Sequence, residues 1–262
     1  MIFPSQHGSA ALRWVSAAAT DKGVVRTVNQ DAFLDRPDLG LWVVADGMGG
    51  HSDGALASRA IVEKLGLLGH PNHLGSAAQA VRGMLQAVNQ DLLDRAAAVP
   101  GGDLIGSTVV VLLAVGGHCA ILWVGDSRVY RLREGVLTQL TTDHSQVQAL
   151  IDAELLSLDQ AEGHPLSNVL LRAVGSDTPL DVDLKIERLR DGDRYLLCSD
   201  GLFREIDPAT LTTALGTSSP PEIVESLIRQ ACERGGRDNV TAVVIDFLTS
   251  SDGNGQHGRL DT

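Results

Sequence analysis

The sequence predicts an α+β fold in which antiparallel sheets pack together and helices cover their outer faces. Three observations lead to this prediction. Two long segments with helical periodicity follow each other, several strand-like apolar runs come after them, and the connections between those runs are of hairpin length. The strict alternation of strands and helices that indicates a parallel sheet is missing from the pattern.

Apolar and β-branched runs mark the predicted strands. They are Trp14–Ala18, Leu41–Ala45, Thr108–Val115, Cys119–Val124, Val129–Leu132, Val182–Glu187, Tyr195–Cys198 and Val240–Phe247. The stretch from Thr108 to Gly125 carries no Asp, Glu, Lys or Arg and reaches the length of a minimal membrane span. Gly116-Gly117 divides it into two halves rich in Val, Ile and Trp, so the sequence predicts two buried strands joined by a tight turn.

Helical periodicity predicts three longer helices and two shorter ones. The longer ones are Gly54–Leu68, Ala77–Ala98 and Glu222–Cys232, and the shorter ones lie near Gln146–Leu156 and Asn168–Val174. Pro220-Pro221 stands at the start of the third helix, where proline is tolerated.

Composition and charge exclude some classes of partner. The 262 residues include 21 Lys+Arg and 33 Asp+Glu, which gives a formal net charge of −12. Nucleic acids and anionic membranes are bound by basic faces, so neither is expected as the main partner. Because no linker or repeat interrupts the composition, one domain over residues 11–249 is predicted, with flexible tails at 1–10 and 250–262.

The cysteines and the N-terminus bear on the compartment. Cys119, Cys198 and Cys232 form no Cys-x-x-Cys pair, which fits a reducing environment. Met1–Thr20 lacks the basic and apolar segments of a signal peptide. We therefore expect a cytoplasmic protein without membrane insertion and, since nothing indicates an obligate assembly, a monomer.

Five aspartates stand at the ends of apolar runs, beside glycine or a turn. They are Asp46, Asp126 and Asp200, which follow such runs, Asp238, which precedes the last one, and Asp31, which precedes Ala32-Phe33. A carboxylate at the buried end of a strand is unfavourable unless it is paired or binds a metal. Each Asp-Gly pair alone is more typical of a turn, but their combination indicates a common site.

A site rich in carboxylate oxygen and poor in nitrogen suits a hard cation, so Mg2+ or Mn2+ is predicted rather than zinc. Gly47, directly after Asp46, allows the backbone to come close enough for its carbonyl to act as a ligand. Two divalent ions about 4 Å apart would turn a bridging water into a hydroxide-like nucleophile. They would also supply the positive field that the acidic chain lacks.

Arg26 and His51 are the remaining candidates for chemistry. Arg26 lies in a polar stretch before Asp31, and a guanidinium can bind a phosphate through two hydrogen bonds, although a lone arginine is more typical of a solvated surface. His51 follows Met48-Gly49-Gly50 and titrates in the range of a proton donor, but a surface histidine is an equally good interpretation.

Taken together, the motifs resemble those of the bacterial metal-dependent protein phosphatases of type 2C. The segments that carry the resemblance, from Val25 to Ile245, are VRTVNQD, VVADGMGGH, GSTVVVLLA, WVGDSRVYRL, LTTDHS, LLRAVG, YLLCSDGL and GGRDNVTAVVI. The resemblance implies a four-layer α-β-β-α sandwich, with two antiparallel sheets flanked by helix pairs and a two-ion Mg2+ or Mn2+ site at one end.

The resemblance also implies roles for the metal ligands. Asp46 would bridge both ions, with the carbonyl of Gly47 on one of them, and Asp200 and Asp238 would hold the other. Asp126, together with Asp200, would serve a weaker third ion. Asp31 would orient metal-bound water or act as a ligand at the margin of the site, and Ser199 and Asn239 would support these ligands.

Substrate groups follow from the same resemblance. Arg26 would bind the phosphate of the substrate. Eukaryotic relatives often carry a histidine general acid where this chain has Met48, so it stays open whether His51 or a water donates the proton. The segment Ser145–His164 corresponds to a variable flap over the site, which would tune substrate access.

The implied function is hydrolysis of phosphoserine and phosphothreonine in proteins by a metal-bridging hydroxide, without a phosphoenzyme. The sequences of the segments Leu39–Val44 and Gly54–Leu65 are also similar to those of phosphatases that accompany type VI secretion systems. This similarity predicts a Ser/Thr kinase as the opposing partner. Three alternatives remain: a pseudophosphatase or phosphoprotein-binding module, a metal-dependent hydrolase of another phosphate compound, and an acidic interaction domain.

Overall fold

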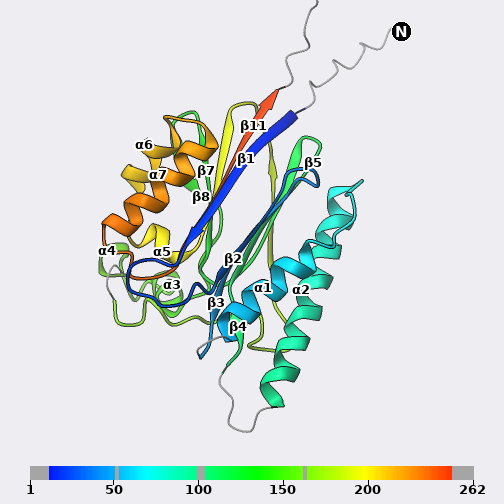
Figure 1. The fold of residues 1–262 in the computed structure, drawn as a ribbon, viewed down its shortest axis with the longest axis vertical. Helices are drawn as coiled ribbons and strands as arrows, with labels where there is room; N and C mark the ends of the chain where they lie inside the picture. The colour runs from blue at the N-terminus through cyan, green and yellow to red at the C-terminus, as the bar shows by residue number, and fades with distance from the viewer. Residues whose placement is uncertain (1–11, 51–52, 99–103, 162–163, 250–262) are drawn as a thin grey trace, which may run out of the picture.

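Two antiparallel sheets form the centre of the computed structural model, which describes residues 12–50, 53–98, 104–161 and 164–249. One pair of helices covers the outer face of each sheet, so the layers run α-β-β-α (Figure 1). The four-layer sandwich predicted from the sequence is therefore confirmed. The tails predicted at 1–10 and 250–262 lie outside the described residues.

The first sheet has the strand order β1-β11-β10-β7-β8. Its strands are β1 (Leu12–Asp21), β11 (Val240–Thr249), β10 (Asp193–Cys198), β7 (Arg128–Arg133) and β8 (Val136–Gln139). Helices α6 (Pro208–Leu215) and α7 (Pro220–Glu233) cover its outer face. In the layer between them, Leu196 and Val244 of the sheet pack in one cluster with Leu227 of α7.

The second sheet has the order β2-β3-β5-β6-β9, and β4 pairs with β3 beside it. Its strands are β2 (Asp31–Arg36), β3 (Leu41–Met48), β4 (Gly106–Ser107), β5 (Val109–Val115), β6 (His118–Val124) and β9 (Asp183–Arg188). Helices α1 (Asp53–Leu65) and α2 (Leu74–Ala97) cover its outer face, where Ile61 and Leu85 share one apolar cluster with Val111.

A third apolar layer fills the space between the sheets. Trp42, Tyr195 and Phe247 are fully buried there, and the ring of Phe247 lies 6.1 Å from Trp42 and 5.5 Å from Tyr195 in edge-on contacts. Because side chains alternate along a strand, every second residue of β3, β10 and β11 points into this layer. At one end of the layer the alternation continues with polar residues, and that end carries the site.

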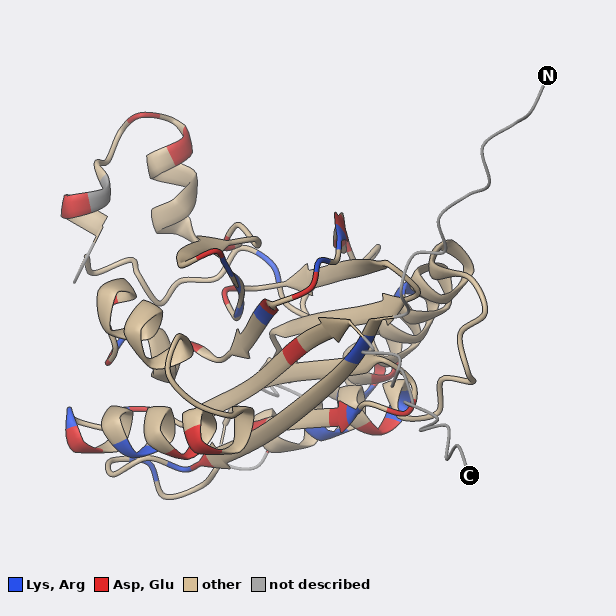
Figure 2. Ribbon diagram, turned by 90° about the horizontal axis from the view of Figure 1, so that it is seen from above, with Lys and Arg blue, Asp and Glu red and all other residues tan. Residues whose placement is uncertain are grey.

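Charged residues are distributed unevenly over the strands. Figure 2 shows Asp, Glu, Lys and Arg on the helices and turns and on some of the strands. Strands β5 and β6 carry none of them, whereas β2, β7 and β9 each carry several. Within the described ranges, no helix combines the length and the apolar character that crossing a membrane requires. The uncharged stretch from Thr108 to Gly125 forms the predicted hairpin, with β5 and β6 joined at Gly116-Gly117.

The helix predicted over Asn168–Val174 is wrong. Two amides of this segment bond to residues far away in the sequence: Leu171 donates to the carbonyl of His144 at 2.8 Å and Val174 to that of Ser107 at 2.9 Å. These long-range bonds take the place of the i to i−4 bonds of a helix. The sequence prediction also omitted β2, β4, β8 and the helices α4 (Leu158–Ala161), α5 (Asp200–Phe203) and α6.

Candidate metal centre

The polar end of the layer between the sheets is a pocket of about 640 Å³. Four of the predicted aspartates line it together with Gly47 and Arg26; they are Asp46, Asp126, Asp200 and Asp238. Asp31 is buried beside them and interacts electrostatically with Asp46. The structure therefore brings together every predicted metal ligand.

Strand register explains how Asp31 and Asp46 meet. They are directly opposite each other in the antiparallel pair β2–β3, so their side chains project from the same face of the sheet. Trp42 and Val44, which alternate with Asp46 along β3, point into the layer between the sheets. Asp46 continues that row beyond the last apolar residue.

Antiparallel pairing brings the other aspartates to the same edge. The ends of β3, β6 and β10 lie at one edge of the sandwich, together with the starts of β2 and β11. Asp126 follows β6, Asp200 begins α5 directly after β10, and Asp238 precedes β11. Five segments that are distant in the sequence therefore each place one carboxylate at this edge.

Asp31 is enclosed by two hydroxyl groups. Its Oδ2 accepts hydrogen bonds from Ser199 Oγ at 2.7 Å and from Thr241 Oγ1 at 2.6 Å. Its Oδ1 is buried and has no hydrogen-bond partner in the described part of the chain. Burial raises the pKa of Asp31 to about 7, although the two hydroxyl groups favour the charged form. Ser199 thus holds the side chain of Asp31, and its support of a metal site stays a prediction.

Two further carboxyl groups, those of Asp46 and Asp126, have pKa values far above the ordinary range. Burial, followed by repulsion from Asp31 and Asp200, raises the pKa of Asp46 well above its usual range. Burial, followed by repulsion from Asp200, raises the pKa of Asp126 to about 7. Without a cation, the charged forms of these groups are therefore strongly disfavoured.

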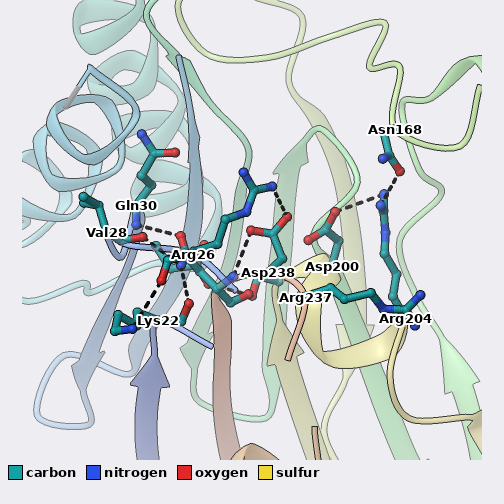
Figure 3. A network of polar contacts seen from close by, with 12 residues as sticks. Lys22, Arg26, Val28, Gln30, Asn168, Asp200, Arg204, Arg237 and Asp238 are labelled. Atoms are coloured by element: carbon teal, nitrogen blue, oxygen red, sulfur yellow. Dashed lines mark hydrogen bonds and ion pairs between the residues drawn. The ribbon is translucent and has the colours of Figure 1, made fainter. Parts of the chain in front are cut away.

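Two arginines neutralise part of this charge (Figure 3). Arg26 Nη2 lies 2.7 Å from Asp238 Oδ2, and this pairing raises the pKa of the guanidinium. Arg204 Nη2 lies 3.0 Å from Asp200 Oδ2. Arg204 is not among the predicted site residues, and its only sequence signal is its position four residues after Asp200.

The donor set fits a hydrated hard cation. Among the described residues, no three Asp, Glu, His or Cys side chains stand close enough together to hold an ion by themselves. Mg2+ in proteins commonly uses only one or two carboxylates and keeps several waters, so such a cage is not required. Asp31 Oδ1 and Asp200 Oδ1 are buried and have no hydrogen-bond partner in the described part of the chain. These two carboxylate oxygens suit such a hydrated ion.

Gly47 has a packing role as well as its predicted one. A Cβ at this position would lie 2.0 Å from the carbonyl oxygen of Gly54 and 2.6 Å from that of Gln30. The first turn of α1 therefore packs directly on the backbone of β3. This contact requires glycine whether or not the Gly47 carbonyl binds an ion, and its role as a ligand stays a prediction.

Asn239 fixes the loop that carries Arg26. Its Nδ2 donates to the carbonyls of Lys22 and Val28 at 2.9 and 3.0 Å, and its Oδ1 accepts from the amide of Gln30 at 2.8 Å. The side chain thus joins both ends of the 22–30 loop to the start of β11.

We expect Asn239→Ala to lower the free energy of unfolding by about 3 kcal/mol, because the three hydrogen bonds of a buried side chain are lost at once. Urea denaturation measures this change, and hydrogen exchange should be faster at the amide of Gln30. A loss no larger than that of an exposed substitution such as Ser218→Ala would show that the loop does not depend on Asn239.

The other predicted elements of the site are partly placed. His51 lies outside the described residues. Met48, which stands where a general acid was considered, lines the pocket. The predicted flap, Ser145–His164, contains the helices α3 (Gln146–Asp152) and α4. The pocket is lined by residues 168–173, which follow the predicted flap in the sequence.

The profile of the protein phosphatase 2C family matches residues 23–249. Serine/threonine protein phosphatase PstP of Mycobacterium tuberculosis is 36% identical over 235 residues, which cover 88% of this chain and 45% of PstP. Serine/threonine phosphatase stp of Listeria monocytogenes is 32% identical over 235 residues, which cover 87% of this chain and 93% of stp. The chain thus spans about half the length of PstP.

Solved structures agree with this. PppA, described as a key regulatory component of the type VI secretion system in Pseudomonas aeruginosa, superposes with a TM-score of 0.86 at 40% identity, covering 92% of this chain and 100% of PppA. The catalytic domain of PstP in complex with two manganese ions has a TM-score of 0.79 at 34% identity, with coverages of 92% and 100%.

Proposed function

Since the chain belongs to the protein phosphatase 2C family, we propose that it is a protein-serine/threonine phosphatase that hydrolyses phosphoserine and phosphothreonine by direct attack of water, without a phosphoenzyme. One observation carries this proposal: the convergence of Asp46, Asp126, Asp200 and Asp238 on a pocket that also contains Arg26. The named activities of PstP and stp, and the two manganese ions bound to PstP, support it.

The cofactor in this proposal is a pair of Mg2+ or Mn2+ ions. When bound, such ions lower the pKa of a water molecule and neutralise charge on the phosphate. Asp46 would hold both ions, Gly47 would contribute its carbonyl, and Asp200 and Asp238 would complete the set. Asp31, buried behind Asp46, would orient water or act as a ligand at the margin.

Arg26 is the residue we propose for phosphate binding. Its side chain is 55% exposed, and Asp238 holds it at the rim of the pocket. A guanidinium has five N–H donors, so the pairing with Asp238 leaves donors for phosphate oxygens. The proton for the leaving alkoxide would come from His51 or from water.

The similarity to PppA suggests a setting for the reaction. We propose that the chain opposes a Ser/Thr kinase of a type VI secretion system and that its substrates are phosphorylated proteins of that system. We also propose that the protein acts as a monomer and that it acts in the cytoplasm.

Arg26→Gln tests the proposed phosphate contact, and a comparison of two substrates tests the substrate class. With Mn2+ present, we expect the variant to lower kcat/KM on a phosphothreonine peptide by about 100-fold, because one preorganised contact to the phosphate is lost. The rate of phosphate release from the peptide and from a nucleotide, measured for wild type and variant, gives the comparison.

The matched control is Arg229→Gln, which removes a similarly exposed arginine from an ion pair on α7. Wild type should prefer the peptide to the nucleotide. A preference for the nucleotide would favour a different phosphate hydrolase, and absence of turnover on both would favour the phosphoprotein-binding alternative.

A further inference from the structure

Arg204 lies between two parts of the molecule that the proposed mechanism does not connect. It follows α5 directly, and its amide donates to the carbonyl of Asp200 at 3.0 Å, so its backbone is fixed at the end of this short helix. The side chain is 31% exposed and lines the pocket. Its guanidinium contacts two carboxylates on one side and the segment 167–168 on the other.

On the carboxylate side, a single nitrogen atom serves both partners. Arg204 Nη2 lies 3.0 Å from Asp200 Oδ2 and 3.6 Å from Asp126 Oδ2. The positive charge of Arg204 therefore stands between the two acidic groups, in the position that a cation shared by them would take. It also acts against the burial that disfavours the charged form of Asp126.

The same guanidinium also bonds to the chain that borders the pocket. Nη1 donates to Asn168 Oδ1 (Figure 3). Nη2, the nitrogen that contacts the carboxylates, also lies 3.4 Å from the carbonyl oxygen of Ser167. The neighbouring backbone has further bonds of its own: Ser167 donates to the carbonyl of His164 at 2.9 Å and Val169 to that of Leu166 at 3.1 Å, and the carbonyl of Val169 accepts from the Gln146 amide at 2.9 Å. Residues 168–173 form one wall of the pocket.

We propose that Arg204 is a positioning residue that occupies the place of a divalent cation between Asp126 and Asp200 and ties the 167–168 segment to the pocket. A guanidinium is charged at every accessible pH and offers several donors in one plane, so it can satisfy both sides at once. A divalent ion can bind to Asp126 and Asp200 only by displacing Arg204, and this releases Asn168. The amount of divalent cation bound by the chain and the position of the pocket wall formed by residues 168–173 are thus linked.

This proposal rests on the proposed function only for the meaning of the pocket, and its test needs no turnover. We would measure bound Mn2+ per chain by equilibrium dialysis and hydrogen exchange of the Ser167 and Val169 amides. Arg204→Gln should bind about one Mn2+ more than wild type, because two carboxylates become available to a hydrated ion. Exchange at the two amides should be about tenfold faster, as expected for the loss of a charge-assisted hydrogen bond.

Three further variants separate the two contacts. Arg204→Lys keeps a cation that reaches Asp200 but cannot also hold Asn168, so it should bind as much Mn2+ as wild type and show the faster exchange. Asn168→Ala should change exchange alone. Asp126→Asn combined with Arg204→Gln should return the Mn2+ content to that of wild type. As a control, Arg229→Gln removes an arginine that also pairs with a carboxylate four residues away, and it should change neither readout.

Unchanged Mn2+ content in Arg204→Gln, or extra Mn2+ in Arg204→Lys, would overturn the cation assignment. Unchanged exchange in Asn168→Ala would overturn the tie to the pocket wall. If Arg204→Gln does not fold, Arg204→Leu is measured in its place for the extra Mn2+, and Asn168→Ala still decides the tie to the pocket wall. Absence of phosphatase activity in wild type would contradict the proposed function and leave these measurements valid.

Discussion

Asp46→Asn is expected to lower kcat on a phosphothreonine peptide by about three orders of magnitude while the fold persists. Asp46 is opposite Asp31 in the β2–β3 pair and lies in the field of Asp126, Asp200 and Asp238. In the proposed site it is the one ligand common to both ions, so its loss removes the charge stabilisation on which the reaction depends. Single-turnover and steady-state phosphate release measure the effect.

The stability of the metal-free variant gives the control. An amide carries no charge, so Asp46→Asn should raise the melting temperature of the chelated protein and remove most of its response to Mn2+. Asp38→Asn, at the opposite end of the β2–β3 hairpin and in an exposed pair with Arg36, should leave turnover unchanged. Wild-type rates in Asp46→Asn would show that the metal assignment is wrong.

The metal-free protein is also expected to lose stability as the pH rises from about 4 to about 7. Asp31 and Asp126 have their pKa values raised from 3.8 to about 7 in the folded state. The folded state therefore binds more protons than the unfolded state over this range, and the free energy of unfolding falls as the pH increases. A pKa difference of one unit corresponds to about 1.4 kcal/mol, so the loss is large enough to be measured.

Divalent cations should reverse this loss. At pH 8 and 100-fold above the dissociation constant, each independent ion adds about 2.7 kcal/mol to the free energy of unfolding. At pH 4, where the carboxyl groups are protonated, the same ion should add little. Thermal unfolding across pH, with Mn2+ and with a chelator, measures both effects. A melting temperature that a chelator does not change at pH 8 would contradict a gathered cluster.

Much of the fold could be predicted because its strands are strongly patterned. The runs at Leu41–Ala45 and Cys119–Val124 are apolar throughout, and every residue of them is buried in the structure. Strand β8 has no such signal, since it is a short edge strand with exposed residues at both ends. Helix α6 has a signal of another kind, a helix start that the prediction did not use. Asp207 caps the helix by accepting from the Thr210 amide at 2.9 Å, and Pro208 stands in its first turn.

The acidic part of the site could be predicted for a similar reason. An aspartate at the buried end of a strand is unfavourable by itself, so each position is informative even before its neighbours are known. Arg204 and Asn168 offer no comparable signal, because they are common surface residues whose role arises only from the contact between α5 and a distant loop. The error at Asn168–Val174 has the same origin, since its hydrogen bonds are made to distant segments.

In the proposed site, the pairing of Asp31 with Asp46 links metal binding to the alignment of one hairpin. If β2 slipped by a single residue along β3, its side chains would exchange faces, and Asp31 would turn away from Asp46 toward the helix side. Ions that need both carboxylates would bind only the correctly aligned hairpin. In the proposed site, bound metal would therefore stabilise the correctly aligned hairpin relative to a shifted one.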